Sequence, residues 1–383
     1  MGKEFMFSRP QDIVVGKGSL AKLPEIAQKL GGTHGFIISG PHLNKMGIVK
    51  SCADALGGVG IPVDAYTETE GNPSVETVDK AAEAFKKSGA DFIIALGGGS
   101  PMDVAKAVGV VAKYGGSITE YEGGGKVPGD IVPLIAIPTT AGTGSEVTAF
   151  SVITDHSRNY KLTVFSYKII PSYAILDPEL LTTAPVSVAA ACGIDAMVHA
   201  LEAYISKAAS PFTDAMAEKA LELIGKNIRR YVADRSDVQA AENMLTGSLF
   251  AGIAFSWARL GDVHAMSHPV SAFFNVPHGV ANAILLPTIV EYNALADNGK
   301  YLKIYNYISR TPVFENEFEP FMLVELLEEL NAQLGIPASL GEVGVTADKF
   351  DAMAEDAMKS GNIAVNPRST TKKDVLSLYE KAL

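Results

Sequence analysis

Hydrophobic residues in the first half of the chain fall in short runs that alternate with amphipathic stretches. The runs are rich in Ile, Leu, Phe and Ala and are bounded by glycine or proline, which is typical of buried strands. Strands separated by helices form parallel sheets that are covered on both faces. We therefore expect an α/β domain with a parallel sheet. The expected strands are 35–40, 61–66, 91–96 and 133–138, and the expected helices between them are 75–88 and 101–114.

The pattern changes near Pro185, and the remainder of the chain has mostly helical periodicity. This change predicts two domains, an α/β domain at 1–185 and an all-helical domain at 186–383. We expect the two domains to pack closely and to form a cleft, where ligand sites are common. The expected helices are 186–206, 214–232, 238–255, 262–273, 321–334 and 373–383.

Composition and charge narrow the function classes. The 383 residues carry 32 basic and 43 acidic side chains, a formal net charge of −11, which argues against nucleic acid or an anionic membrane as a main partner. The opening segment Met1–Met6 has no apolar core of a secretory signal, and no uninterrupted apolar run reaches the roughly 20 residues of a membrane-spanning helix. Cys52 and Cys192 are the only cysteines, which favours a reducing, cytoplasmic setting.

A glycine-rich segment at 97–103 lies between an expected strand and an expected helix. Its glycines allow the backbone to approach an anion, and the helix N-terminus offers N–H groups and partial positive charge. Ser100 is expected to cap the helix and Pro101 to occupy its first turn. A tight turn without a ligand is the alternative interpretation. A second polar loop at 139–146 could complete a dinucleotide site or be only a flexible loop, and neither a Gly-x-Gly-x-x-Gly nor a Walker A sequence is present.

Four of the seven histidines fall within eighty residues, and an aspartate precedes the first of them. Asp195 and His199 have i, i+4 spacing, as do His264 and His268, so each pair lies on one side of a helix. His278 follows shortly after. Three imidazoles and one carboxylate are sufficient to bind a divalent transition metal, and a further histidine could move protons. The alternative is that these are separate buried histidines with structural partners.

These segments resemble the iron-containing, or group III, alcohol dehydrogenases. The resemblance covers essentially the whole chain, with the metal and nucleotide motifs in the family's order and spacing. It implies an N-terminal Rossmann-like domain that binds NAD(P) and a helical metal-binding domain, an architecture shared with dehydroquinate synthase. The segments that carry the resemblance are 97–106, 139–146, 192–202, 264–269 and 275–283.

The resemblance also assigns roles to residues. It implies that Asp195, His199, His264 and His278 bind iron(II), with zinc as a possible substitute, and that His268 is an additional active-site histidine. Positions that match the family's cofactor contacts are Asn72, Gly98, Gly99, Ser100, Asp103, Thr139, Thr140, Thr143, Ser145 and Lys161.

Gly40 departs from the pattern of several family members, which have an aspartate after the corresponding strand. A carboxylate there accepts hydrogen bonds from the adenosine ribose and repels a 2′-phosphate. Glycine removes that repulsion, so we expect NADP(H) to be accepted along with, or in preference to, NAD(H).

The resemblance implies reversible hydride transfer between a small alcohol and nicotinamide, with the metal stabilising charge on the alcohol oxygen and His268 relaying the proton. Phe150, Phe255 and Trp257 could line an apolar substrate pocket or be core aromatics. Family members form dimers and larger assemblies, so a homo-oligomer is expected. The alternatives are a zinc-dependent glycerol or polyol dehydrogenase, a lyase like dehydroquinate synthase, and a non-catalytic metal- or nucleotide-binding protein.

Overall fold

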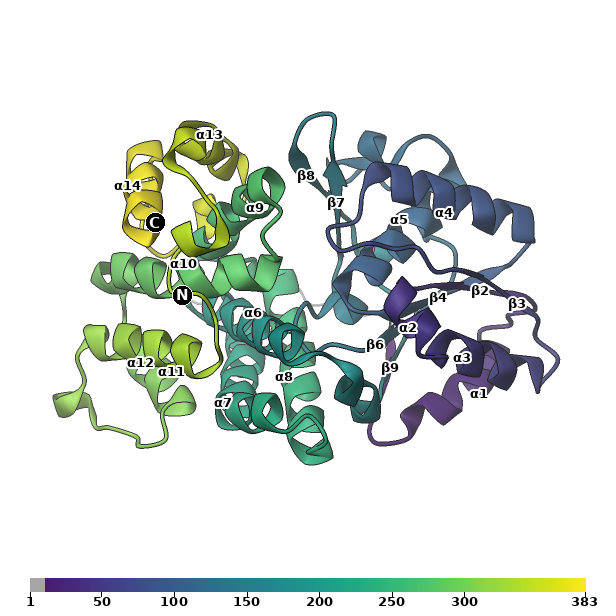
Figure 1. Ribbon diagram of the computed structural model, residues 1–383, viewed down its shortest axis with the longest axis horizontal. Coiled ribbons are helices and arrows are strands. Elements are labelled where there is room, and N and C mark those ends of the chain that lie inside the picture. Colours follow the sequence, from purple (N-terminus) through teal and green to yellow (C-terminus); the bar gives the residue numbers. More distant parts are fainter. Residues whose placement is uncertain (1–10) are drawn as a thin grey trace. The chain divides into compact units, whose positions relative to one another are not determined.

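Residues 11–383 are described by the computed structural model, and their backbone contacts divide them between two units (Figure 1). The first, here named the sheet unit, contains residues 11–140 and 145–183. The second, the helical unit, contains residues 184–383 together with the short segment 141–144. The segment Met1–Met6, from which we expect no secretory signal, lies outside the described residues.

The sheet unit is built on a six-stranded, all-parallel sheet with the strand order β1-β9-β6-β4-β2-β3. The four expected strands are confirmed as β2, β3, β4 and β6. The strands β1 and β9, of four residues each, were not predicted. The strand bounds are β1 Asp12–Val15, β2 Gly35–Ile38, β3 Val63–Tyr66, β4 Phe92–Gly97, β6 Leu134–Pro138 and β9 Tyr173–Leu176.

The central strands are buried on both faces, as the continuous apolar runs predicted. Side chains of a strand alternate between the two faces. Accordingly, Phe36 and Ile93 belong to one hydrophobic cluster, whereas their neighbours Ile37 and Ile94 belong to another. Helices α4 and α5 contribute to the first cluster, and α1 and α3 to the second. The helix bounds are α1 Leu23–Lys29, α2 Pro41–Lys45, α3 Ile48–Gly57, α4 Val75–Ser88 and α5 Gly99–Tyr114.

A second, three-stranded sheet was not predicted from the sequence. Its order is β5-β8-β7, with β5 at Gly123–Gly124, β7 at Phe150–Asp155 and β8 at Tyr160–Phe165. Strands β7 and β8 form an antiparallel hairpin. The alternating pattern of β8, in which Leu162 and Val164 are buried, was the signal available in the sequence.

The helical unit consists of nine α-helices among the described residues, and short 3-10 segments occur between some of them. The six expected helices are confirmed within three residues at each end, and α10, α11 and α13 were not predicted. Polar and apolar residues mix along α10, which contains Pro287, so its periodicity is weak. The bounds are α6 Val186–Ile205, α7 Pro211–Ala233, α8 Val238–Ala258, α9 Asp262–Phe274, α10 His278–Asn293, α11 Lys300–Ile308, α12 Pro320–Gln333, α13 Phe350–Lys359 and α14 Lys372–Ala382.

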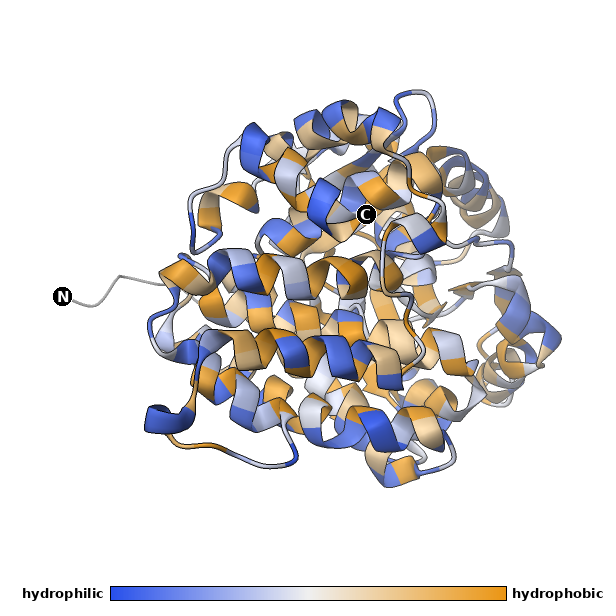
Figure 2. Cartoon of the chain, turned by 60° about the vertical axis from the view of Figure 1, so that its left-hand side comes forward, coloured by the Kyte–Doolittle hydropathy of each residue, from blue (hydrophilic) through white to orange (hydrophobic). Residues whose placement is uncertain are grey.

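Helix α6 is the central helix of this unit. Among residues 11–383, it is the one helix that is long and apolar enough to cross a membrane. However, 72% of its most apolar 18-residue stretch is buried inside the protein. The helix also buries Asp195, His199 and Glu202, which lie at i, i+4 and i+7 on one side. It packs against α7, α8 and α10, and Figure 2 shows polar residues interspersed with apolar ones along the helices of this unit. Its apolar surface therefore serves the protein core.

Candidate metal centre and cofactor loops

Three helices of the helical unit bring the predicted metal-binding side chains together. Asp195 and His199 lie one turn apart on α6, which places both side chains on the same face. His264 lies in the first turn of α9, and His278 is the first residue of α10. Asp195, His199 and His264 are almost fully buried, whereas the side chain of His278 is 24% exposed.

The distances between these side chains fit the binding of one ion. Asp195 Oδ1 lies 3.9 Å from His199 Nε2, 3.7 Å from His264 Nε2 and 3.9 Å from His278 Nε2. Ligand atoms about 2.1 Å from a tetrahedral metal ion are about 3.4 Å apart. One ligand atom from each of the three buried residues, Asp195, His199 and His264, lies within 4.8 Å of the other two. Nitrogen and oxygen donors without a thiolate suit Fe²⁺, Zn²⁺, Co²⁺ or Mn²⁺.

The surroundings prepare Asp195 and His199 to bind a cation. Burial lowers the pKa of His199 to about 4, although Asp195 acts in the opposite direction, so this imidazole is neutral at physiological pH. Burial by itself would raise the pKa of Asp195, but the neighbouring histidines His199, His264 and His278 lower it far below its usual range. The carboxylate is therefore ionised, as ligation requires.

His264 differs from His199 because a second carboxylate faces it. Burial lowers its pKa, but Glu202 and Asp195 outweigh burial and raise the pKa to about 9. Glu202 Oε2 lies 2.5 Å from His264 Nδ1, and both side chains are 2% exposed. Metal binding and protonation therefore compete for His264.

Partners on the far side of the rings orient the imidazoles. Gly142 O lies 3.2 Å from His199 Nδ1, and Glu202 faces His264 Nδ1, so the Nε2 atom of each ring is directed to the common point. Such partners of metal-binding histidines fix the tautomer and the ring orientation. Glu202 was not among the predicted site residues, although its position seven residues after Asp195 was an available signal.

Asn282 is a further residue that sequence analysis missed. It lies one turn after His278 on α10 and is fully buried. Its amide nitrogen donates to Asp195 Oδ1 at 2.7 Å and lies 3.1 Å from His264 Nε2 and 3.2 Å from His278 Nε2. The amide therefore orients the carboxylate and lies against the two ring nitrogens that face it.

His268 lies beside the predicted ligands rather than among them. It follows His264 by one turn of α9, and its ring centroid is 6.2 Å from that of His264 and 5.1 Å from that of His278. The residue is half-buried. Of the aromatic residues considered for the substrate pocket, Phe255 stacks on His199 with centroids 4.4 Å apart, whereas Phe150 belongs to the sheet unit and stacks on Phe165.

The predicted cofactor residues of the sheet unit gather at one edge of its sheet. Because the strands are parallel, the segments that follow them lie at the same edge, where α/β folds bind ligands. Gly40 follows β2, Asn72 follows β3, and Gly98, Gly99 and Ser100 follow β4. Thr139 and Thr140 follow β6, the neighbour of β4.

The glycine-rich turn has a tighter geometry than a capped helix requires. Gly97 has φ of +148°, and a Cβ there would lie 2.7 Å from Pro101 Cγ. A Cβ on Gly98 would lie 3.1 Å from Thr140 Oγ1. The expectation that Ser100 caps α5 is wrong. The N-cap is Gly98 and Ser100 is already helical, because glycine allows the helix to begin closer to the strand. The first-turn N–H groups are not capped by an N-cap side chain, as an anion site requires.

A buried lysine connects the two predicted cofactor loops. Lys106 Nζ donates to Ser145 Oγ at 2.9 Å, to Thr148 Oγ1 at 3.2 Å and to Phe150 O at 2.7 Å. Ser145 Oγ in turn donates to Asp103 Oδ1 at 2.7 Å. Burial lowers the pKa of Lys106 to about 8, against the raising influence of Asp103 and Glu146. This network joins α5 to the segment before β7 and was not predicted.

Two other predicted cofactor residues form a pair. Lys161 Nζ on β8 donates to Asn72 Oδ1 at 2.7 Å, and Asn72 has a left-handed backbone with φ of 53°. The backbone N–H of Thr154 on β7 donates to Pro73 O at 2.7 Å, which holds this turn against the hairpin. Thr143 belongs to the segment 141–144 of the helical unit, so the sheet unit does not contain it.

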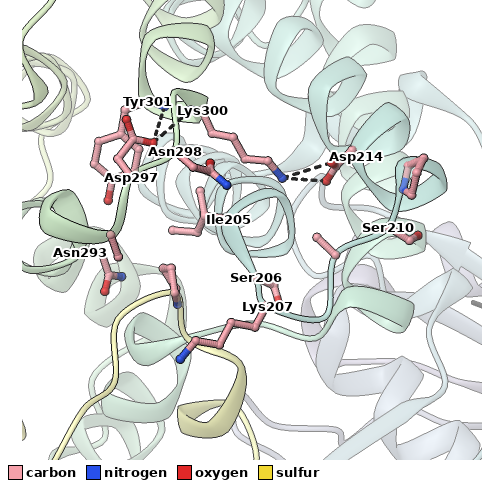
Figure 3. A pocket seen from close by; sticks show the side chains of 14 residues that line it. Ile205, Ser206, Lys207, Ser210, Asp214, Asn293, Asp297, Asn298, Lys300 and Tyr301 are labelled. Carbon is pink, nitrogen blue, oxygen red and sulfur yellow. Dashed lines mark hydrogen bonds and ion pairs between the residues drawn. The ribbon is translucent and has the colours of Figure 1, made fainter. Parts of the chain in front are cut away.

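A cavity of about 500 Å³ in the helical unit contains none of the predicted site residues (Figure 3). Two of its charged side chains, Lys300 and Asp214, pair with each other. Lys300 Nζ donates to both oxygens of Asp214 at 3.0 and 3.1 Å, and Asp297 accepts the backbone N–H groups of Lys300 and Tyr301. These contacts give no ground for assigning a ligand to the cavity.

Comparison with known proteins places both units in one family. Residues 10–178 match the iron-containing alcohol dehydrogenase model, and residues 189–383 match the C-terminal model of the Fe-containing alcohol dehydrogenase family. A similar solved structure, the crystal structure of a 1,3-propanediol oxidoreductase, has a TM-score of 0.95 at 35% identity, with all of both chains covered.

Two curated relatives cover nearly the whole chain. The NADPH-dependent butanol dehydrogenase of Clostridium saccharobutylicum is 37% identical over 390 residues, which covers 98% of this chain and 97% of the relative. The NAD-dependent methanol dehydrogenase of Bacillus methanolicus is 33% identical over 378 residues, covering 98% and 99%. The chain belongs to the iron-containing alcohol dehydrogenase family, and it is an NAD(P)-dependent oxidoreductase of alcohols and aldehydes.

Proposed function

We propose that Asp195, His199, His264 and His278 together hold one divalent cation, iron(II) with zinc as a possible substitute. The observation that carries the proposal is the approach of three Nε2 atoms to within 3.7–3.9 Å of one carboxylate oxygen. A cation bound there supplies Lewis-acid stabilisation of negative charge on the alcohol oxygen. Two measurements on anaerobically prepared protein test this proposal. The first is the metal content per chain, and the second is turnover, followed by the absorbance of the reduced nicotinamide cofactor.

The substrate that we propose is a small primary alcohol or diol and the corresponding aldehyde. Phe255 stacks on His199 beside the predicted ligands, which supports an apolar surface next to the reacting oxygen. The names of the relatives, which include butanol and methanol dehydrogenases, agree with this class. A panel of short alcohols and aldehydes, assayed in both directions, tests it, and the absence of turnover with the whole panel would contradict the proposal.

His268 is proposed to move the proton that leaves the alcohol hydroxyl. Its half-buried ring lies 5.1 Å from the ring of His278, so it has access both to the predicted site and to water. An imidazole, with an ordinary pKa of about 6.5, exchanges protons readily near neutral pH. The alternative role is a neighbour that only orients water or cofactor.

The proposed nucleotide site is the carboxyl edge of the sheet, with the cofactor phosphates at the N-terminus of α5. Gly98, Gly99 and Ser100 supply close backbone approach and N–H groups. Asp103, Thr139, Thr140, Thr143, Ser145, Asn72 and Lys161 complete the proposed set of cofactor residues.

Gly40 is proposed to admit NADP(H), because no carboxylate follows β2 at this position. The backbone at Gly40 is extended, with φ of −98° and ψ of 164°, so other residues can adopt it, although a Cβ would lie 3.2 Å from Thr69 O. Gly40→Asp should lower kcat/KM for NADPH relative to NADH, and Gly40→Asn is the uncharged control of the same shape. A strong NADH preference in the unmodified enzyme would contradict the proposal, as would an unchanged ratio in Gly40→Asp.

The enzyme is further proposed to work in the cytoplasm as a homo-oligomer. The cytoplasmic setting is proposed because the chain has only two cysteines, as is typical of a reducing compartment. Cys52 is buried, and burial raises the pKa of its thiol to about 11. The oligomer rests on the family resemblance. Light scattering coupled to size-exclusion chromatography measures the assembly.

A further inference from the structure

Helix α9, which carries His264, begins without a cap of its own. Its N-cap is Gly261, which has no side chain, and uncapped N–H groups at a buried helix start need acceptors from elsewhere. Two distant side chains supply them. Asn366 Oδ1 accepts the N–H of Asp262 at 3.2 Å, and Glu202 Oε1 accepts the N–H of Val263 at 2.8 Å.

The second oxygen of Glu202 faces the metal-binding histidine of the same helix. Glu202 Oε2 lies 2.5 Å from His264 Nδ1. An ionised carboxylate can only accept hydrogen bonds, so Nδ1 must carry the proton of this contact. The lone pair of the neutral ring is then at Nε2, on the side of Asp195. One side chain therefore fixes both the start of α9 and the tautomer of its imidazole.

Gly261 makes room for this arrangement. A Cβ at this position would lie 2.9 Å from Glu202 Oε1 and 2.9 Å from Asn366 Oδ1. A residue with a side chain at position 261 would push away at least one of the two acceptors. The glycine is therefore required by the close approach of both side chains to the helix start.

We propose that Glu202 is the positioning residue for His264 in the metal centre, because it holds this imidazole in the tautomer and orientation that direct Nε2 to the cation. The inference rests on the proposed function, in which His264 binds the metal. Outer partners of this kind typically change metal affinity by about 10–100-fold when they are removed. Glu202 does not itself contact the predicted cation position, so its role is exerted through His264.

The variant Glu202→Gln tests the tautomer directly because it keeps the shape of the side chain. Glutamine has one acceptor oxygen, whereas Glu202 uses two. If the oxygen stays with Val263 N–H, the amide NH₂ faces His264 Nδ1 and favours the proton on Nε2, where it blocks ligation. We expect cobalt(II) or zinc(II) to bind about 10–100-fold more weakly, measured by competition with a chromogenic chelator.

The matched control is Asn366→Ala, which removes the other acceptor at the start of α9 but does not contact His264. It should lower the melting temperature while leaving metal affinity within a few fold of the unmodified protein. An equal loss of affinity in both variants would show that helix capping alone is responsible and would overturn the inference. Unchanged affinity in Glu202→Gln would overturn it as well. If the unmodified protein itself binds no cation tightly, the proposed metal centre fails instead.

A second measurement needs no variant and applies even if Glu202→Gln does not fold. Nitrogen-15 NMR of the zinc-loaded protein with labelled histidine distinguishes protonated from metal-bound ring nitrogens. His264 is expected to show a protonated Nδ1 and a metal-bound Nε2. A metal-bound Nδ1, or an Nδ1 without a proton, would overturn the inference.

Discussion

The helical unit and the sheet unit build their sites from different parts of the polypeptide. In the helical unit, buried side chains converge, and further buried side chains such as Glu202 and Asn282 orient them. In the sheet unit, the central feature is backbone, a glycine turn at the start of α5 in which Gly97 and Gly98 have little room for a side chain. The metal centre should therefore depend on individual functional groups, and the nucleotide loop on chain conformation.

The difference also determines which changes each site tolerates. Removing a ligand such as His264 leaves the helices in place but removes a donor atom. Adding even a methyl group to the glycine turn changes the path of the chain. Variants that separate metal affinity from cofactor affinity can therefore test whether the two units act as distinct parts.

The largest effect is expected from His264→Ala. Loss of one imidazole donor should remove tight metal binding and lower turnover by several orders of magnitude, because the charge that develops on the substrate oxygen loses its stabilisation. Metal content per chain and kcat measure the two effects. Binding of NAD(P)H, measured by fluorescence, should persist, and retention of metal in this variant would contradict the ligand assignment.

His268→Ala should have the next largest effect and should separate proton transfer from metal binding. Loss of a general acid–base group typically lowers the rate by about 10²–10⁴-fold. The metal content should remain that of the unmodified enzyme, and the pH profile of kcat should lose one titrating group. Metal loss equal to that of His264→Ala would show that His268 is a ligand and that the assignment of roles is wrong.

Gly97→Ala should affect the nucleotide loop and leave the metal centre unchanged. The positive φ and the 2.7 Å approach to Pro101 Cγ make an alanine strained by about 1–3 kcal/mol. We expect a lower melting temperature and about tenfold or greater weakening of NAD(P)H binding, with unchanged metal content. Gly89→Ala is the control, since Gly89 also has a positive φ but meets no atom within 4 Å. Equal loss of cofactor affinity in both variants would contradict a specific role of this turn.

The last prediction concerns stability rather than activity, and it is a pH dependence of the chelator-treated protein. The pKa of His264 is raised from 6.5 to about 9, so its stabilising contribution is complete below about pH 6.5 and is lost as the pH rises to about 9. The pKa of His199 is lowered to about 4, which has the opposite sign and removes stability as the pH falls from about 6.5 to 4.

Urea unfolding measures this dependence. Between about pH 6.5 and 9, the free energy of unfolding of the chelator-treated protein should fall by up to a few kcal/mol, since one pKa unit corresponds to about 1.4 kcal/mol. The metal-loaded protein should not show this loss, because the ligands are deprotonated in it. A loss of the same size in both forms would assign it to other groups.

The sequence predicted the parts of the molecule that depend on local patterns. The apolar runs gave β2, β4 and β6, and the glycine-rich segment gave the turn before α5, because burial on both faces and glycine clustering are local signals. The i, i+4 spacing grouped Asp195 with His199, and family resemblance joined these to His264 and His278. The strands β1 and β9 were missed, and their pairing joins Asp12 to Tyr173, two positions about 160 residues apart that no local pattern connects.

The outer contacts of both sites depend on chain segments that meet only in the fold. Lys106 reaches Ser145 and Phe150 from about forty residues away, and Glu202 reaches His264 across 62 residues. No spacing rule predicts such contacts. The start of α5 was misplaced because a serine before a proline suggested a cap, whereas the glycines allowed the helix to begin two residues earlier.

The most direct test of the account is the titration of metal-free protein with cobalt(II), followed by visible absorption. We predict one cobalt ion per chain, with the ligand-field bands of a nitrogen and oxygen donor set, and loss of tight binding in His264→Ala but not in His268→Ala. Absence of stoichiometric binding would contradict the account. Thiolate charge-transfer bands would also contradict it, since they would require Cys192 or Cys52 in place of the assigned ligands.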